Sequence, residues 1–91
     1  MRLIEKEMLN AIEQGMNWNK DNTAVNCHGS LIHVYLHGNH IATVIRGSEM
    51  VEVNKRTLKQ WATPTTKSRL RALGVDVCTR NHVTYLNGEA V

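Results

Sequence analysis

The sequence predicts an α+β fold: an antiparallel β-meander of about four strands with an N-terminal helix, two short helices and a C-terminal β-hairpin. Three observations support this prediction. Apolar residues near the N-terminus recur at helical spacing. Glycine pairs typical of hairpin turns then follow at a constant interval of nine residues, at positions 29, 38 and 47. No segment suggests the long crossover that a parallel sheet requires.

The length and composition limit the class of protein. The 91 residues suffice for a single domain, residues 1–91, but not for two separate cores. No apolar run reaches the roughly 20 residues of a membrane span, and the N-terminus lacks the pattern of a signal peptide. We therefore expect a cytoplasmic protein without membrane association, whose two cysteines, Cys27 and Cys78, are reduced. A domain of this size has modest stability, which homodimerisation would increase.

The first segment is predicted to be an amphipathic helix. Its apolar residues recur at i, i+4, i+7 and i+8: Ile4, Met8, Ala11 and Ile12. Glu5 and the other polar residues are expected on the remaining surface, and Gly15 is expected to end the helix. Residues 16–22 are expected to form a polar loop around Trp18.

The glycine pairs set the register of the meander. Glycine followed by serine or asparagine suits a two-residue type II′ turn, so Gly29-Ser30 and Gly38-Asn39 are predicted as hairpin tips. Both registers then place one set of apolar residues on a common face: Val25, Cys27, Ile32, Val34, Leu36, Ile41 and Ile45. The opposite face receives His33, Tyr35, His37, His40, Ala42 and Val44.

A fourth strand is expected around residues 50–53, after a turn at Gly47-Ser48. A strict two-residue loop would place Val51 and Val53 on the second face, together with Val44 and Ala42. A three-residue loop would return them to the first face. The sequence leaves both alternatives open.

Two short helices are expected next. Asn54 is predicted to cap the first, KRTLKQWA, in which Leu58 and Trp61 point inward at i and i+3. The second lies in TPTTKSRLRALG, where the cap is Thr63 or Thr65 and Gly74 ends the helix. The final hairpin, VDVCTR and HVTYLN, is predicted to turn at Arg80-Asn81 and to end at an Asn87-Gly88 turn.

Enzymatic motifs are missing from the sequence. It contains no P-loop, no G-x-S-x-G, no G-x-G-x-x-G and no H-E-x-x-H, and its carboxylates are scattered. Cys78 and His82 form a C-x3-H spacing, but nothing forces these residues to converge with other histidines on a metal. We therefore expect a non-enzymatic protein without a metal or other cofactor.

The segment between Glu52 and Asp76 is strongly basic. It contains six cations and no acid: Lys55, Arg56, Lys59, Lys67, Arg69 and Arg71. The hydroxyls of Thr65 and Thr66 at a helix start, next to cations, are typical of an anion site that suits phosphate. The simpler interpretation is that short surface helices carry lysine and arginine for solubility.

Three functions remain open. The basic segment favours a nucleic acid, either DNA or RNA, as the partner. Alternatively, the protein inhibits an acidic host protein. It would bind that protein either through the basic segment or through a contact face containing His33, Tyr35, His37 and His40. The third alternative is a structural module that forms a homodimer. Tyr35 and Tyr85 are candidates for base stacking in the first of these functions, and Tyr35 is favoured because it lies on the face with the histidines.

Three motifs, YLHGNHIATV, TTKSRLRALG and the closing YLNGEAV, together resemble small uncharacterised proteins of tailed bacteriophages. Trp61 and Thr65-Thr66 match that pattern, which covers roughly residues 17–88. The resemblance implies a phage origin and action in the host cytoplasm, without implying an activity. The element order is also similar to that of a double-stranded-RNA-binding domain, from which the two C-terminal strands and the short basic helix depart.

Overall fold

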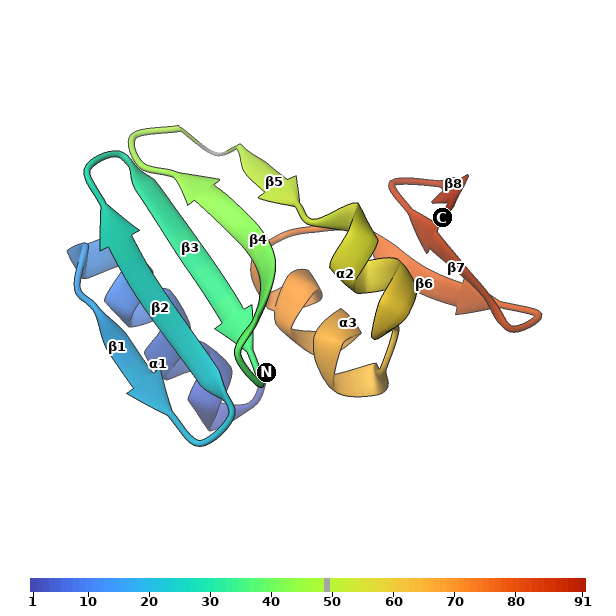
Figure 1. Cartoon of the computed structure of the whole chain (residues 1–91), viewed down its shortest axis with the longest axis horizontal. Coiled ribbons are helices and arrows are strands. Elements are labelled where there is room, and N and C mark those ends of the chain that lie inside the picture. Colours follow the sequence, from blue (N-terminus) through green and yellow to red (C-terminus); the bar gives the residue numbers. More distant parts are fainter. Residues whose placement is uncertain (49) are drawn as a thin grey trace.

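A computed structural model describes residues 1–48 and 50–91 and confirms the α+β class (Figure 1). The first sheet is antiparallel and contains, in spatial order, β1 (Trp18–Lys20), β2 (Thr23–His28), β3 (Leu31–Leu36), β4 (Asn39–Ile45) and β5 (Val51–Val53). The second contains β6 (Val77–Arg80), β7 (Val83–Leu86) and β8 (Glu89–Ala90). Helix α1 (Leu3–Gln14) lies behind the first sheet in Figure 1, whereas α2 (Lys55–Gln60) and α3 (Pro64–Ala72) lie between the two sheets.

Helix α1 ends as predicted, because Gly15 adopts a left-handed conformation with a φ of 66°. Met8 and Ala11 are fully buried against the sheet. The expectation for Glu5 is wrong, since its side chain is buried as well. Residues 18–20, expected within a loop, form the edge strand β1, so the meander has five strands rather than about four.

The hairpin of β2 and β3 confirms the predicted register. Cys27 pairs with Ile32 and Val25 pairs with Val34. Gly29 has a φ of 59°, the positive value that the first central residue of a type II′ turn requires. Val25, Ile32 and Val34 consequently share the buried face of the sheet.

The hairpin of β3 and β4 departs from the prediction. The turn is at His37-Gly38, where both residues have positive φ values of 51° and 78°, as in a type I′ turn. The register then shifts by one residue, because Tyr35 pairs with His40 whereas Val34 pairs with Ala42. Ile41 is the extra residue of this β-bulge, and it remains buried as predicted.

The bulge exchanges the faces of the residues that follow it. Ala42 and Val44 pack in the core rather than on the opposite face, and Ile45 pairs with Leu31 on the side away from the core. Strand β5 has the pairing expected for a strict two-residue loop, with Val51 opposite Val44 and Val53 opposite Ala42. Both valines nevertheless pack against the core, because the bulge has already turned their partners inward.

Asn54 caps α2 as predicted, and of the two candidate caps for α3, Thr63 and Thr65, the structure has Thr63. The Asn54 carboxamide oxygen accepts a hydrogen bond from the Thr57 backbone N–H at 3.1 Å, and the Thr63 hydroxyl accepts one from the Thr66 N–H at 3.2 Å. Leu58 is buried, but the inward orientation predicted for Trp61 is wrong, since its side chain is 47% exposed beyond the end of α2.

The C-terminal hairpin forms with its turn displaced by one residue. Asn81 and His82 both have positive φ values, so the turn lies at these two residues rather than at Arg80-Asn81. The Asn87-Gly88 turn is confirmed and leads into β8, which extends the hairpin to three strands.

Both sheets and all three helices contribute to one hydrophobic cluster. Its buried members are Met8, Ala11, Val25, Ile32, Val34, Leu36, Ile41, Ala42, Leu58, Leu70, Val75, Val77 and Leu86. Within residues 1–48 and 50–91, no helix combines the length and the apolar content needed to cross a bilayer.

Candidate nucleic-acid interface

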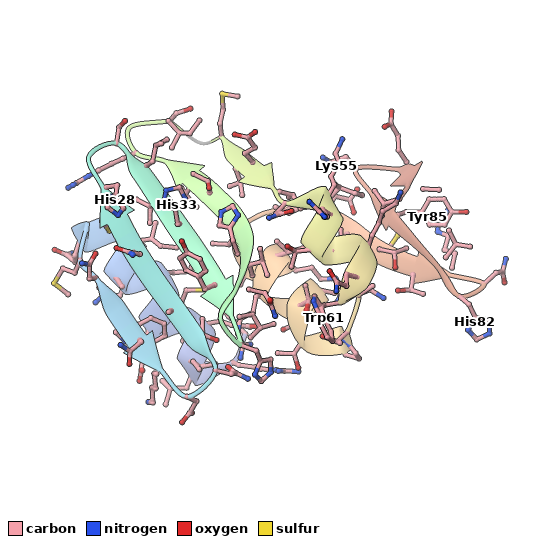
Figure 2. All side chains as sticks on the ribbon, in the orientation of Figure 1. His28, His33, Lys55, Trp61, His82 and Tyr85 are labelled. Atoms are coloured by element: carbon pink, nitrogen blue, oxygen red, sulfur yellow. The ribbon has the colours of Figure 1, made fainter. Side chains whose placement is uncertain are left out.

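One face of the first sheet is packed on the core, and no described element crosses the opposite face in Figure 1. We call this the open face. The strand pairing places two rows of side chains on it: Asn19, Ala24, Tyr35 and His40 in one, and Asn26, His33, Thr43 and Glu52 in the other. In Figure 2 the side chains of His28 and His33 lie on this face.

The predicted contact residues are therefore brought together in part. The rings of His33 and His40 lie 5.4 Å apart between centroids, and those of Tyr35 and His40 lie 5.6 Å apart. All three side chains are half-buried. His37 does not join them, because it occupies the exposed β3–β4 turn.

A hydrogen-bonded chain fixes the two histidine rings. The Thr43 hydroxyl lies 2.9 Å from His33 Nδ1 and 2.8 Å from His40 Nε2. Asn54 lies at the other end of the chain, with its Nδ2 3.1 Å from His40 Nδ1. We call this series, Asn54–His40–Thr43–His33, the histidine relay.

The capping bond of Asn54 sets the direction of the relay. Because the Asn54 carboxamide oxygen accepts from the Thr57 N–H, the amide NH₂ is left to face His40 Nδ1 and donates to it. His40 therefore carries its proton on Nε2 and donates to the Thr43 oxygen. The Thr43 proton is then directed to His33 Nδ1. If His33 Nδ1 instead carried a proton and donated it to Thr43, the nearly buried Thr43 oxygen would accept from both histidines. The hydroxyl proton of Thr43 would then have no acceptor in the relay.

The surroundings of His40 favour its neutral form. Burial lowers the pKa of His40, and the charge of the nearby His33 lowers it further. A backbone hydrogen bond involving Ala42 and the charge of Glu52 oppose this shift without reversing it. The relay acts in the same direction, because a protonated His40 would have to donate from Nδ1 towards the amide protons of Asn54.

The cations of α2 are exposed, as a phosphate-binding role requires. Lys55, Arg56 and Lys59 are exposed and border a hollow of about 510 Å³, which also contains Glu89 and Ala90. In the part of the chain that the structure describes, the side-chain ion pairs are those of Lys20 with Glu7 and of Arg69 with Glu5. The three α2 cations are therefore outside any ion pair between described residues.

The cations predicted on α3 are less available. Arg69 is 3% exposed and donates to the buried carboxylate of Glu5, so it does not belong to the surface. Lys67 donates to the Thr79 hydroxyl, and Arg71 is exposed but donates from Nε to the Val77 carbonyl at 2.9 Å. The six predicted cations thus separate into an exposed group on α2 and a group on α3 that is largely engaged in holding the fold together.

The hydroxyls at the start of α3 do not form the expected anion site. Thr66 is 2% exposed, and its hydroxyl is hydrogen-bonded to that of Thr63 at 2.9 Å. Thr65 is half-buried. The Thr63 hydroxyl also accepts from the Thr66 N–H, so the first turn of this helix is already capped from within the protein.

Glu5 is the buried structural partner of Arg69, and the sequence does not single it out. It precedes Met8 by three positions and Ile12 by seven, which places it on the buried face of α1. This spacing indicates that Glu5 faces the core. The general tendency of glutamate to lie at the surface favours the opposite prediction, which is wrong here.

Two hollows lie along the open face. The first, of about 400 Å³, is lined by residues of β1 and β2 together with Tyr35. The second, of about 720 Å³, extends from His40 and Thr43 past Asn54 to Lys55 and ends against Leu86 and Asn87. A third hollow, of about 310 Å³, is apolar and lies beside the exposed Trp61. Within residues 1–48 and 50–91, no three His, Cys, Asp or Glu side chains come together to hold a metal ion.

Comparison with known proteins places the chain in a family. A family model described as "Kyanoviridae Gp96 protein" matches residues 1–91. The chain belongs to this family. The family is one of phage proteins, in agreement with the resemblance noted in the sequence. No curated protein and no solved structure matches the chain.

Proposed function

We propose that this phage protein is a non-enzymatic accessory protein that binds nucleic acid in the cytoplasm of the infected host. The observation that carries this proposal is the exposed group of cations on α2: Lys55, Arg56 and Lys59. Neither α2 nor α3 contains an acidic residue. The local field therefore attracts a polyanion, even though the net charge of the chain is only +3.

Phosphate contacts of this kind have a measurable signature. Each phosphate that a lysine or arginine neutralises releases condensed counterions, so the affinity falls as salt rises. With three cations engaged, the slope of log K against log[salt] is expected to be about −2 on a single strand and about −3 on a duplex. A helix that carries lysine and arginine only for solubility gives no such binding.

The proposal is tested by fluorescence anisotropy with labelled RNA and DNA oligonucleotides at several salt concentrations. The variant Lys55→Gln/Arg56→Gln/Lys59→Gln is expected to weaken binding by about tenfold or more and to reduce the salt slope by about 2. The matched control is Lys6→Gln/Arg46→Gln/Arg80→Gln, which removes the same charge from three exposed residues on other elements. An equal loss in the control, or no binding by the folded wild-type protein, would contradict the proposal.

A further inference from the structure

We infer that the open face of the first sheet stacks the bases of a single-stranded nucleic acid, with Tyr35 and His40 as the stacking rings and Lys55 as the nearest phosphate contact. This inference rests on the proposed function and specifies its ligand. The carrying observation is that the two hollows of the open face lie on either side of the Tyr35–His40 ring pair.

The first hollow has the features of a base site. Two aromatic residues line it, Trp18 from β1 and Tyr35 from β3. The cross-strand neighbour of Tyr35 is Ala24, whose small side chain leaves room beside the Tyr35 ring. Asn19 and Asn26 also line it and are exposed, and no described side-chain hydrogen bond engages their amide groups. The amide of Asn17, by contrast, already accepts from the Cys27 N–H at 2.7 Å. A flat ligand with donors and acceptors on its edge fits this combination.

The second hollow connects the stacking face to the cations. Its lining begins at His40 and reaches Lys55, the first residue of α2. Glu52 lies on the same hollow and repels phosphate, so the backbone of a bound strand is directed towards the Lys55 side. Charge complementarity therefore favours a strand whose bases lie on the open face and whose phosphates lead to Arg56 and Lys59.

The hydrogen bonding of the face holds its rings in place for stacking. The histidine relay fixes His40 between Thr43 and Asn54, so less conformational freedom is lost when a base stacks on it. Base stacking on rings tolerates any sequence, but it requires unpaired bases. In a duplex the base faces are covered by their neighbours, so the open face selects single strands.

The test compares fluorescein-labelled oligouridylate and oligothymidylate of about ten nucleotides with a duplex of the same length, using the full chain. The single strands are expected to bind about tenfold more tightly than the duplex. Tyr35→Ala is expected to weaken single-strand binding by about tenfold, and Tyr35→Phe is expected to retain it. Tyr85→Ala removes a tyrosine from the second sheet, away from the open face in Figure 2, and should leave binding unchanged.

A second readout does not depend on how well the variants fold. An oligonucleotide carrying 5-iodouracil, irradiated on the wild-type protein, is expected to cross-link to Tyr35 or His40, as located by mass spectrometry. Cross-links confined to other elements would overturn the inference. The comparison of RNA with DNA identifies which strand the face prefers.

The outcomes separate this inference from the proposed function. If the α2 triple variant weakens binding while Tyr35→Ala does not, and the duplex binds as tightly as the single strand, the stacking face is wrong and the α2 contacts stand. If Tyr35→Ala weakens binding and the α2 triple variant does not, the assignment of phosphate contacts to α2 is wrong and the stacking face stands. Absence of binding to every oligonucleotide would overturn both.

Discussion

The guanidinium of Arg69 donates to the carboxylate of Glu5 at 2.7 Å, across 64 positions of the chain, and both side chains are 3% exposed. Ser68 donates to the same carboxylate oxygen at 2.6 Å. Arg69 Nε also donates to the Thr23 hydroxyl at 3.0 Å, which connects α3 to β2 as well as to α1. In the described residues no buried side-chain nitrogen or oxygen lacks a hydrogen-bond partner, and this includes the atoms of the charged pair.

The first prediction concerns this ion pair. Arg69→Met is expected to destabilise the protein by about 3 kcal/mol or more, because it leaves the Glu5 carboxylate buried without its counter-charge. The double variant Glu5→Leu/Arg69→Met removes both charges and should recover much of this loss. Urea denaturation monitored by circular dichroism measures both values. A single variant within about 1 kcal/mol of wild type would show that the pair does not hold α1 and α3 together.

The second prediction is a dependence of stability on acid pH. Burial raises the pKa of Glu5, but the hydrogen bonds from Ser68 and Arg69 outweigh it, so the pKa lies below its usual value of 4.5. A carboxyl whose pKa is lower in the folded state stabilises the protein above its unfolded pKa, and this contribution is lost as the pH falls through the folded pKa. Stability is therefore expected to fall below about pH 4.5, more steeply in wild type than in Glu5→Gln.

Denaturation midpoints between about pH 3 and pH 6 test this dependence. The matched control is Glu13→Gln, which changes an exposed glutamate on the same helix. If the acid limb of Glu5→Gln is as steep as that of wild type, another group is responsible.

The third prediction separates the two roles of Asn54. Asn54→Asp keeps an oxygen that accepts from the Thr57 N–H, but it replaces the donor to His40 Nδ1 with a carboxylate. The helix cap should therefore survive, while the pKa of His40 rises because its protonated form gains a partner. Asn54→Ala removes both contacts and is expected to cost about 1 kcal/mol. Histidine titration by NMR measures the pKa, and an unchanged value in Asn54→Asp would contradict the relay.

The fourth prediction concerns the proton positions in the relay. His40 and His33 are both expected to carry their proton on Nε2, because each Nδ1 accepts a hydrogen bond. Long-range nitrogen–proton NMR spectra distinguish the two imidazole tautomers. Thr43→Val keeps the shape of the side chain and removes the hydroxyl, so it should release the tautomer preference of His33 while leaving that of His40 set by Asn54.

The fifth prediction concerns the β3–β4 turn. His37 adopts a φ of 51° in front of Gly38, a conformation that is costly for most side chains and less so for asparagine. His37→Asn creates the Asn-Gly pair preferred in type I′ turns and is expected to stabilise the protein by about 0.5–1 kcal/mol. Thermal denaturation measures the effect, with His28→Asn, an exposed position at the end of β2, as the control. A destabilised His37→Asn would show that His37 has a role beyond the turn.

Local signals in the sequence predicted most of the fold. Gly15 and Asn54 act on neighbouring residues, and both were placed correctly, whereas the cap of α3 is Thr63, one of the two predicted candidates. The register of β2 and β3 followed from the position of Gly29 and its single positive φ. These features depend on backbone geometry within a few residues, which a sequence pattern records directly.

The errors arose where a rare local conformation or a distant segment decides the outcome. A left-handed histidine is rare, so the pattern favoured Gly38-Asn39 over His37-Gly38 as the turn. The partner of Arg69 lies 64 positions away, and nothing in the spacing of α3 shows that this cation faces inward. The open face was predicted in part, because Tyr35 and His33 alternate with core residues on β3, whereas Thr43 reached it only through the bulge.

The bulge at Ile41 also determines where the chain leaves the sheet. The Ile41 carbonyl accepts a hydrogen bond from the Asn54 N–H at 2.8 Å. The bulge residue therefore contacts the N-cap residue of α2 directly. The same Asn54 holds His40 through its side chain. Asn54 therefore connects α2, which carries the cations, to both the bulge and the His40 ring, and these contacts set the spacing between the helix and the ring. Deletion of Ile41 would shorten β4 and is expected to misalign the histidine and tyrosine rings with the α2 cations, the two halves of the proposed interface.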